Sequence, residues 1–290
     1  MRYVIPISGK DSLATAIIQN KIEPDLPYEY FFNDTGFELP ETYNWLKCVN
    51  NQLGFNLITV GESLEDIIWL EGILPSPKTR FCTRKSKIIP MENFLIGGEV
   101  TIYLGLRYDE KGRKGYIPPK KSKITPRYPL IENEIILNDI YKIVPENLLP
   151  PSFFWPELFE RVKEKLKPFN IDLKESDLSH KEKSILFSWR SRPNCYNCFY
   201  MSYYEWIGLS EFHPLLFLKA VDMENTTGAS NYTINQGIDL VSILKYREHY
   251  LNNRANKVCK IYLQMKQQTK FLLSDQDMIL DYNCGPFCGK

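Results

Sequence analysis

Short apolar runs alternate with segments of helical periodicity along the first half of the chain. Regular alternation of strand and helix is typical of a parallel sheet that helices cover on both faces. The pattern therefore predicts an α/β fold with a Rossmann-like doubly wound parallel sheet. Its predicted strands lie near residues 2–6, 28–33, 56–60 and 100–106, and its predicted helices near 11–21, 40–53, 63–70 and 84–95.

The pattern becomes mainly helical beyond a group of prolines at Pro145, Pro150, Pro151 and Pro156, which marks a domain boundary. We therefore expect an α/β domain over residues 1–145 and a helical C-terminal region over 146–290. Further helices are predicted near residues 135–144, 157–167, 203–224 and 237–253.

A polar loop joins the first predicted strand to the first predicted helix. The first N–H groups of a helix have no intrahelical partners and lie at the positive end of its dipole, so they favour a phosphate. The spacing differs from the Walker A motif. An ordinary turn with a helix cap is the alternative reading. The residues of this predicted phosphate loop are Ser8, Gly9, Lys10, Asp11 and Ser12.

Two further motifs follow predicted strands. Asp34, Thr35 and Gly36 come after the second strand, and Gly105 and Arg107 end the fourth. Ligands of open α/β sheets bind at the carboxyl ends of the strands, next to a switch point in strand order. We therefore expect both motifs to lie beside the phosphate loop.

The seven cysteines include two close pairs. Cys195 and Cys198 form a C-x-x-C pair, and Cys284 and Cys288 flank Gly and Pro residues near the end of the sequence. Four thiolates suit either a structural Zn²⁺ or a [4Fe–4S] cluster. The alternatives are an unliganded tail pair and a redox dithiol at the first pair. The other cysteines outside these pairs, apart from Cys82, are expected to be packing or surface residues.

Composition excludes some classes of protein. The formal net charge of +1 argues against a globally basic nucleic-acid coat. No apolar run approaches the length of a membrane span and no signal-peptide pattern is found, so we expect a cytoplasmic protein with no membrane partner. Residues 111–127 hold seven Lys or Arg and no acidic residue. They predict a basic loop that binds a polyphosphate, the second phosphate of a sulfonucleotide or a nucleic-acid backbone, unless it is only a solvated loop.

Taken in order, the motifs resemble the 3′-phosphoadenosine-5′-phosphosulfate (PAPS) reductase family, a branch of the PP-loop adenine-nucleotide enzymes. The family's loop reads Ser-x-Gly-Lys-Asp-Ser, its second strand ends in Asp-Thr-Gly before Pro-Glu-Thr, and its fourth ends in Gly-[Ile/Leu]-Arg-x-x-Glu. The chain departs at one point, because Ile7 stands where the family has its first Ser. The resemblance implies a PP-loop (HUP-type) fold over residues 1–145 that binds ATP, PAPS or adenylylsulfate (APS).

The resemblance also implies a mechanism. Lys10 and Arg107 would balance charge at the phosphates, Asp11 would orient Mg²⁺, its water or an amide, and Asp34 and Gly36 would line the adenosine. The expected reaction is AMP-forming activation with pyrophosphate release, coupled to sulfur transfer from a sulfur donor.

Two alternatives to this reaction stay open. One is a sulfonucleotide reductase that releases sulfite with a thiol reductant protein. The tail of true PAPS reductases reads Glu-Cys-Gly-[Leu/Ile]-His, whereas here Asn283 precedes Cys284 and the His is missing. The other is a non-catalytic nucleotide sensor or nucleic-acid-associated component of a phage or anti-phage system, which Ile7 favours.

Relatives with the late cysteines hold iron–sulfur clusters, so the resemblance favours [4Fe–4S] over Zn²⁺. Cys82 lies where cluster-containing adenylylsulfate reductases have two cysteine ligands. It is therefore a cluster ligand that replaces one of the tail pair, an active-site thiol, or a small buried hydrophobe.

Overall fold

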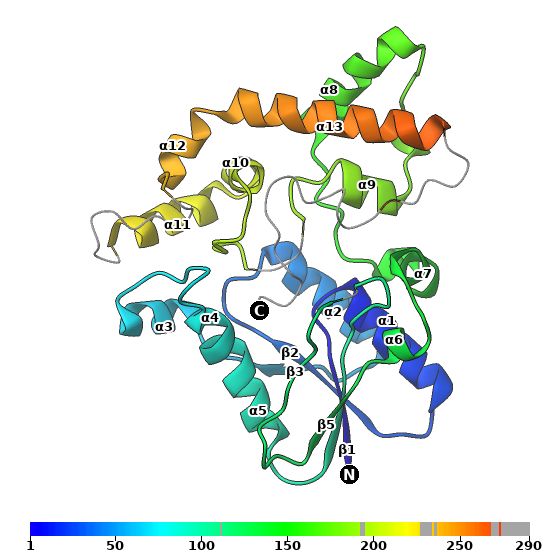
Figure 1. Ribbon diagram of the computed structural model, residues 1–290, viewed down its shortest axis with the longest axis vertical. Helices are drawn as coiled ribbons and strands as arrows, with labels where there is room; N and C mark the ends of the chain where they lie inside the picture. Colours follow the sequence, from blue (N-terminus) through cyan, green and yellow to red (C-terminus); the bar gives the residue numbers. More distant parts are fainter. Residues whose placement is uncertain (111, 192–194, 227–233, 235–236, 268–272, 274–290) are drawn as a thin grey trace.

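The computed structural model describes residues 1–110, 112–191, 195–226, 234, 237–267 and 273. Within these residues five strands form one parallel sheet, in the order β3-β2-β1-β4-β5 (Figure 1). The strands are β1 (Arg2–Pro6), β2 (Tyr28–Asn33), β3 (Ile58–Val60), β4 (Val100–Tyr103) and β5 (Ile124–Arg127). The chain winds outward from β1 to β3 and then returns to the other side of β1 at β4. The switch point of this Rossmann-type order therefore lies between the carboxyl ends of β1 and β4.

Alternate residues of each strand face opposite layers of helices, which confirms the doubly wound parallel sheet. Ile5 of β1 packs into one apolar cluster with helices α1 (Lys10–Ile22), α2 (Pro40–Leu53) and α7 (Leu137–Ile143). Val4 and Phe31 pack on the opposite side, against Met91 and Leu95 of α5 (Ile89–Leu95). Both faces of the sheet are therefore covered, and only the ends of the strands remain open to a ligand.

The basic stretch 111–127 is not a loop throughout, because its last four residues form β5 at the edge of the sheet. Pro126 lies opposite Ile102 in this strand. Proline is tolerated at a sheet edge, where its missing N–H faces away from the ladder. The strand predicted at 100–106 ends earlier, at Tyr103, and the chain that follows lies against the first turn of α1 at Gly105.

The predicted helix 84–95 is longer and interrupted. It consists of α4 (Phe81–Thr83), a π-helical turn at Arg84–Ile88 and α5, and it follows α3 (Leu64–Glu71). The Ser86 hydroxyl donates a hydrogen bond of 2.6 Å to the Cys82 carbonyl inside this turn. Turns of this kind are frequent at functional sites.

The C-terminal region is mainly helical, as predicted. Its largest apolar cluster also takes in Phe37, Leu39 and α3 from the sheet side, so apolar contacts cross the expected boundary at residue 145. The boundary itself stays a prediction. The remaining helices are α6 (Pro129–Glu132), α8 (Pro156–Leu166), α9 (His180–Leu186), α10 (Tyr203–Phe212), α11 (Pro214–Thr226), α12 (Leu240–Leu244) and α13 (Arg247–Gln267), with 3₁₀ turns at Glu146–Leu148, Lys167–Phe169 and Glu175–Asp177.

Among the described residues, none of the helices combines the length and the apolar character that crossing a membrane requires.

Candidate functional site

The phosphate loop is closed by the side chain of Ser12. Its hydroxyl accepts hydrogen bonds from the N–H groups of Ser8 (2.9 Å) and Gly9 (3.1 Å), and it donates to the Gly9 carbonyl at 2.9 Å. Ser12 is buried, whereas Ser8 is exposed at the edge of the loop. In this arrangement Ser12 shapes the loop, and the first-turn N–H groups of α1 are left for an anion.

The residue at the departure from the family pattern, Ile7, lies in the core. Its side chain is fully buried among the residues between the sheet and α1, and its N–H donates to the Phe31 carbonyl at 2.7 Å. The substitution therefore adds apolar packing beneath the loop, while Ser8 supplies a hydroxyl one position later.

Gly105, at the end of β4, lets two segments approach closely. A Cβ atom at this position would lie 2.7 Å from the Ser12 nitrogen and 2.8 Å from the Asp11 carbonyl carbon. Both are backbone atoms that cannot rotate away. The glycine therefore allows the β4 backbone to lie directly against the first turn of α1, across the switch point.

Arg107 holds the loop from behind. Its Nη1 donates to Asp11 Oδ2 at 2.7 Å and its Nε to Asp109 Oδ1 at 2.9 Å, and the side chain is 3% exposed. The other Asp11 oxygen, Oδ1, is buried and accepts no hydrogen bond from the described residues, with Lys10 Nζ 3.9 Å away. Arg107 thus fixes one oxygen of Asp11 and leaves the other directed toward Lys10.

The three residues after β2 form a tight turn. Asp34 Oδ1 accepts hydrogen bonds from the Gly36 N–H (2.8 Å) and the Tyr43 hydroxyl (2.7 Å), and Gly36 has a positive φ of 74°. Burial raises the pKa of Tyr43, and its hydrogen bond to Asp34 raises it further. Asp34 therefore stabilises this turn through the two hydrogen bonds that its Oδ1 accepts.

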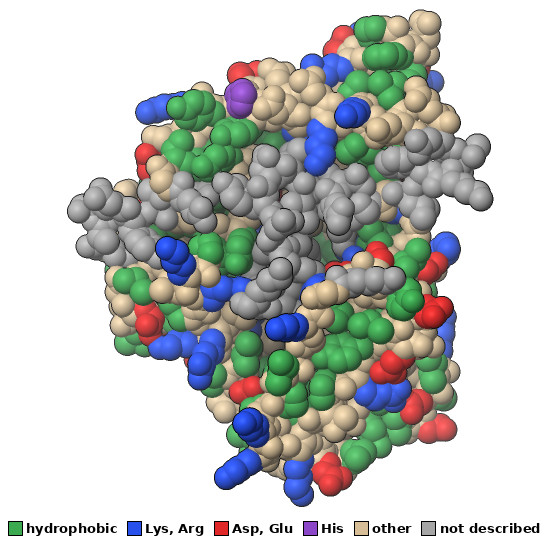
Figure 2. Space-filling model, in the orientation of Figure 1, with side chains coloured by type: hydrophobic (Ala, Val, Ile, Leu, Met, Phe, Trp, Pro, Cys, Tyr) green, Lys and Arg blue, Asp and Glu red, His purple; other side chains and the backbone are tan. Residues whose placement is uncertain are grey.

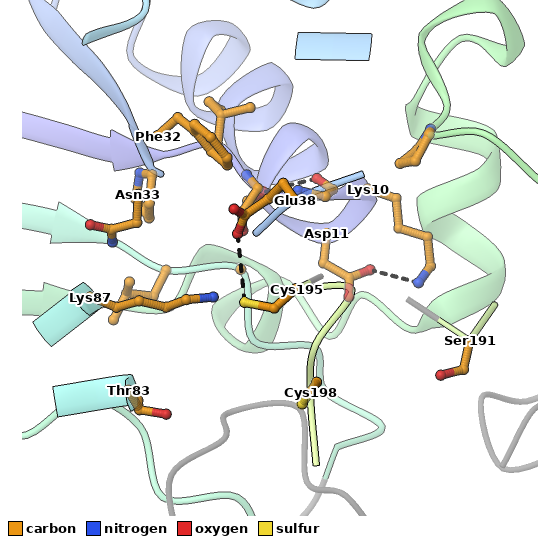
Figure 3. Close-up of a pocket in the computed structure, with 18 of the residues that line it drawn as sticks. Lys10, Asp11, Phe32, Asn33, Glu38, Thr83, Lys87, Ser191, Cys195 and Cys198 are labelled. Atoms are coloured by element: carbon orange, nitrogen blue, oxygen red, sulfur yellow. Dashed lines mark hydrogen bonds and ion pairs between the residues drawn. The ribbon is translucent and has the colours of Figure 1, made fainter. Parts of the chain in front are cut away.

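One cavity of about 660 Å³ lies at the carboxyl ends of β1, β2 and β4. Figure 3 shows Lys10 and Asp11 on one side of it, Asn33 and Lys87 on another, and the two cysteines 195 and 198 between them. The residues of the predicted loop line it, together with Gly105. Its other polar and charged lining residues include Asn33, Glu38, Ser86, Lys87, Glu110, Arg113, Lys114, His180, Arg190 and Ser191.

The thiol of Cys195 is buried at this cavity and lies in a polar cluster. Its Sγ is 3.3 Å from Thr35 Oγ1 and 3.9 Å from Glu38 Oε1, and the Thr35 hydroxyl donates to Glu38 Oε2 at 2.8 Å. Burial raises the pKa of Cys195 to about 11, and nearby Lys87 opposes this rise. Burial therefore disfavours the thiolate form of Cys195.

The backbone around Cys195 is tied to both halves of the molecule. The Tyr196 N–H donates to the Phe37 carbonyl at 2.7 Å, and Arg190 Nη2 donates to the Cys195 carbonyl at 2.7 Å. Arg190 is 3% exposed and is anchored within the C-terminal region. These contacts hold the cysteine segment, residues 195–198, against the turn after β2.

Cys82 and Cys198 also line the cavity, and both are partly buried. In the described part of the chain no group of three or more His, Cys, Asp or Glu side chains is arranged to hold a metal ion. Cys284 and Cys288 lie outside the described residues. The four-cysteine metal site stays a prediction, and so does the choice among the three roles of Cys82.

The structure brings most of the predicted site residues together, but not all of them at the cavity surface. Ser8–Ser12, Gly105, Cys82, Cys195 and Cys198 line it, whereas Asp34, Thr35, Gly36 and Arg107 lie behind its wall. The sequence reasoning missed Asn33, Glu38, Lys87 and Arg190. The first two adjoin the Asp34–Gly36 motif, and that position at a strand end is a signal that could have found them.

Comparison with known proteins gives a family match and a similarity to solved structures. The family model for the phosphoadenosine phosphosulfate reductase domain matches residues 2–125. No curated protein matches the chain. Among solved structures the chain is similar to the phosphoadenylyl-sulfate (PAPS) reductase of Candida auris, solved as a phosphate complex, with 19% identity over 55% of this chain and 77% of that one and a TM-score of 0.39.

Proposed function

Since residues 2–125 belong to the phosphoadenosine phosphosulfate reductase domain family, we propose that this chain is an enzyme that binds an adenine nucleotide at the switch point of its sheet. Its reaction forms AMP with pyrophosphate release and is coupled to sulfur transfer. The observation that carries the proposal is that the phosphate loop, Lys10 and three thiols line a single cavity. A nucleotide and a sulfur centre can meet there.

The loop and its cations would bind the phosphates of ATP. The N–H groups of the first turn of α1 and the ammonium group of Lys10 favour negative charge at the same place. Lys87 and Arg113 line other parts of the cavity wall. Groups fixed in advance around a developing charge are where most of the rate enhancement in such a site arises.

In the proposed reaction an acceptor oxygen attacks the α-phosphorus of ATP. The bond from that phosphorus to the oxygen bridging to the β-phosphate breaks, and pyrophosphate leaves. A sulfur nucleophile from a donor then bonds to the acceptor as AMP departs. Lys10 and the loop stabilise the departing phosphate charge, and Arg107 keeps Asp11 in position.

Asp11 fits a Mg²⁺ site. Its buried Oδ1 accepts no hydrogen bond from the described residues, and carboxylate oxygens are ligands that Mg²⁺ prefers. Bound Mg²⁺ would neutralise part of the phosphate charge. Asp11 would hold the ion through this oxygen while Arg107 engages the other one.

A four-cysteine site for [4Fe–4S] or Zn²⁺ would join Cys195 and Cys198 to Cys284 and Cys288. Only the first two belong to the described residues, and they supply half of the thiolates that such a site requires. Cys82 lines the same cavity, which supports it as a replacement for one tail cysteine. Anaerobic purification with metal analysis tests the site, and the variants Cys82→Ser, Cys284→Ser and Cys288→Ser identify its ligands by their loss of metal.

Pyrophosphate release from Mg-ATP tests the reaction. Asp11→Asn should lower the release rate about a hundredfold or more, because it removes the carboxylate charge that would hold Mg²⁺ at the phosphates. Asp109→Asn is the matched control, since Asp109 also pairs with Arg107 but does not line the cavity. Equal activity of the two variants, or no pyrophosphate from the wild type with any acceptor, would reject the AMP-forming reaction.

A sulfonucleotide reductase is the second candidate, and the family match supports it together with the partly buried thiols Cys82 and Cys198 at the cavity. A thiolate would attack the sulfur of PAPS or APS and the nucleotide would leave. Sulfite formed from PAPS and a dithiol, without pyrophosphate from ATP, would select this reaction. Nucleotide binding without either product would select a sensor.

A further inference from the structure

Two separate segments of the chain carry most of its excess basic charge. Residues 72–91 contain five Lys or Arg, residues 111–127 contain seven, and neither segment contains Asp or Glu. Together they hold 12 of the 36 basic residues, so the rest of the chain has 24 basic against 35 acidic residues. The net charge of +1 therefore conceals a strong local asymmetry.

The fold places these two segments next to each other at the cavity. The Tyr116 hydroxyl donates to Glu92 Oε1 of α5 at 2.9 Å, and Tyr116 packs with Met91 and Leu95. Cys82, Thr83, Ser86 and Lys87 line the cavity from the first segment, and Arg113 to Ile117 line it from the second. Figure 2 shows Lys and Arg side chains along the left and lower parts of one face, the region of α4, α5 and the chain before β5 in Figure 1.

Six of these basic side chains are exposed and make no ion pair within the described part of the chain. They form the basic rim, which consists of Lys78, Arg84, Lys114, Lys120, Lys121 and Lys123. Among the other cations, Lys85 pairs with Glu71, Arg113 with Glu110 and Arg127 with Glu132. Lys114 lines the cavity, but the other five side chains of the rim do not, so one nucleotide inside the cavity cannot reach them all. A chain of regularly spaced phosphates can.

We propose that the basic rim binds the phosphodiester backbone of a nucleic acid and guides it to the cavity as the acceptor of the reaction. This inference rests on the proposed function and names its acceptor class. The rim offers cations to phosphates and few aromatic side chains to bases, so binding should be independent of sequence. Such binding weakens steeply with salt, because each phosphate contact releases counterions.

Fluorescence anisotropy with labelled single-stranded DNA, duplex DNA and RNA of about 20 nucleotides tests the proposal between about 50 and 200 mM salt. The triple variant Lys120→Gln, Lys121→Gln, Lys123→Gln should bind at least about tenfold more weakly and should lower the salt slope by about 2. These three lysines do not line the cavity. ATP binding by calorimetry should therefore be unchanged in this variant, which separates failure of the rim from failure of the proposed function.

The control variant Lys142→Gln, Lys167→Gln, Lys174→Gln has the same change in net charge at exposed sites elsewhere on the surface. It should bind nucleic acid like the wild type. The proposal is overturned if the control loses as much affinity as the rim variant, if the wild type shows a flat salt dependence, or if polyglutamate competes as well as DNA. Preference among the three nucleic acids identifies the physiological class, and binding of none of them rejects the proposal.

Discussion

The phosphate loop and the cysteine segment contribute to one cavity, but different kinds of contact build them. The loop is held by neighbours in the α/β unit, namely the Ser12 hydroxyl, the Gly105 backbone and the Arg107 side chain at the opposing strand end. The cysteine segment is held by contacts over about 160 residues of sequence, from Thr35 and Phe37 to Cys195 and Tyr196.

This difference teaches which parts of a site follow from local sequence. In the loop, conformation and electrostatics are set by the topology of a parallel sheet, which brings strand ends to one edge. At Cys195, the pKa of the thiol is raised mainly by burial, and the packing of the C-terminal region against the turn after β2 produces that burial. Substitutions in the two regions should therefore have different consequences, and the following predictions test that separation.

The largest effect is expected from Arg107→Gln. The substitution leaves Asp11 and Asp109 without their shared cation, which should cost about 2 to 3 kcal/mol, less than for a fully buried pair because both carboxylates are partly exposed. Because Asp11 would be misplaced, kcat for pyrophosphate release should fall about a hundredfold or more, with a smaller change in KM. Urea denaturation and steady-state kinetics measure the two effects.

Arg127→Gln is the control for this prediction. Arg127 is the last residue of the edge strand β5 and pairs with Glu132, but 43% of its side chain is exposed, so this ion pair should contribute less than about 1 kcal/mol. If the two variants have the same kcat for pyrophosphate release, Arg107 does not position Asp11, and its ion pairs contribute only to stability.

A smaller effect is expected from Gly105→Ala. The added methyl group would meet the backbone of Asp11 and Ser12, so the first turn of α1 must move away from β4. Such overpacking should cost about 1 to 3 kcal/mol. Displacement of the loop should weaken ATP binding about tenfold to a hundredfold, as measured by calorimetry.

Gly9→Ala is the matched variant for stability, because nothing lies within 4 Å of the position of its added Cβ and its backbone is extended. It should unfold at nearly the same urea concentration as the wild type. If the Gly105→Ala protein is as stable as the wild type and binds ATP as tightly, the close approach across the switch point is not required.

Thr35→Val tests the second region. The Thr35 hydroxyl donates to buried Glu38 and contacts the Cys195 thiol, so its loss leaves a carboxylate oxygen without that donor. We expect a cost of about 1 to 2 kcal/mol in urea denaturation. In a double-mutant cycle with Cys195→Ala the two changes should be non-additive by about 0.5 kcal/mol or more.

The control is Thr79→Val, at an exposed position where, among the described residues, the hydroxyl bonds to Ser76 alone. It should change stability by less than about 0.5 kcal/mol. Strict additivity of Thr35→Val and Cys195→Ala would mean that the polar cluster does not link the turn after β2 to the cysteine segment.

Much of the sheet could be predicted from the sequence, because four of its strands are apolar runs and the helices between them keep a helical period. β5 was missed, since Ile124 to Arg127 contain a proline and lie in a basic stretch, and only pairing with β4 makes them a strand. The sequence predicts Arg107 as a site residue, and the structure pairs it with Asp11 away from the cavity surface. A motif gives the order of residues along the chain but not how deeply each is buried. The Thr35–Glu38–Cys195 cluster carries no periodic signal at all.

The smallest predicted effect concerns the contact between His180 of α9 and the segment before α8, near the boundary between the two regions. The His180 ring donates a hydrogen bond of 2.9 Å from Nε2 to the Pro150 carbonyl, and both residues line the cavity. Burial lowers the pKa of His180 below its ordinary value. The folded state therefore prefers the neutral ring more strongly than the unfolded state does.

The sign of the pH dependence follows from that preference. The contribution of the neutral His180 ring to the free energy of unfolding should be fully present above the ordinary pKa of histidine. It should be lost as the pH falls through the lower pKa of the folded state. The variant His180→Gln keeps an N–H donor but cannot be protonated. Between about pH 7.5 and 5 the midpoint of urea denaturation should therefore fall further for the wild type than for this variant. Parallel curves would show that protonation of His180 is not coupled to folding, and that the α9 contact is less buried in solution than the hydrogen bond to Pro150 implies.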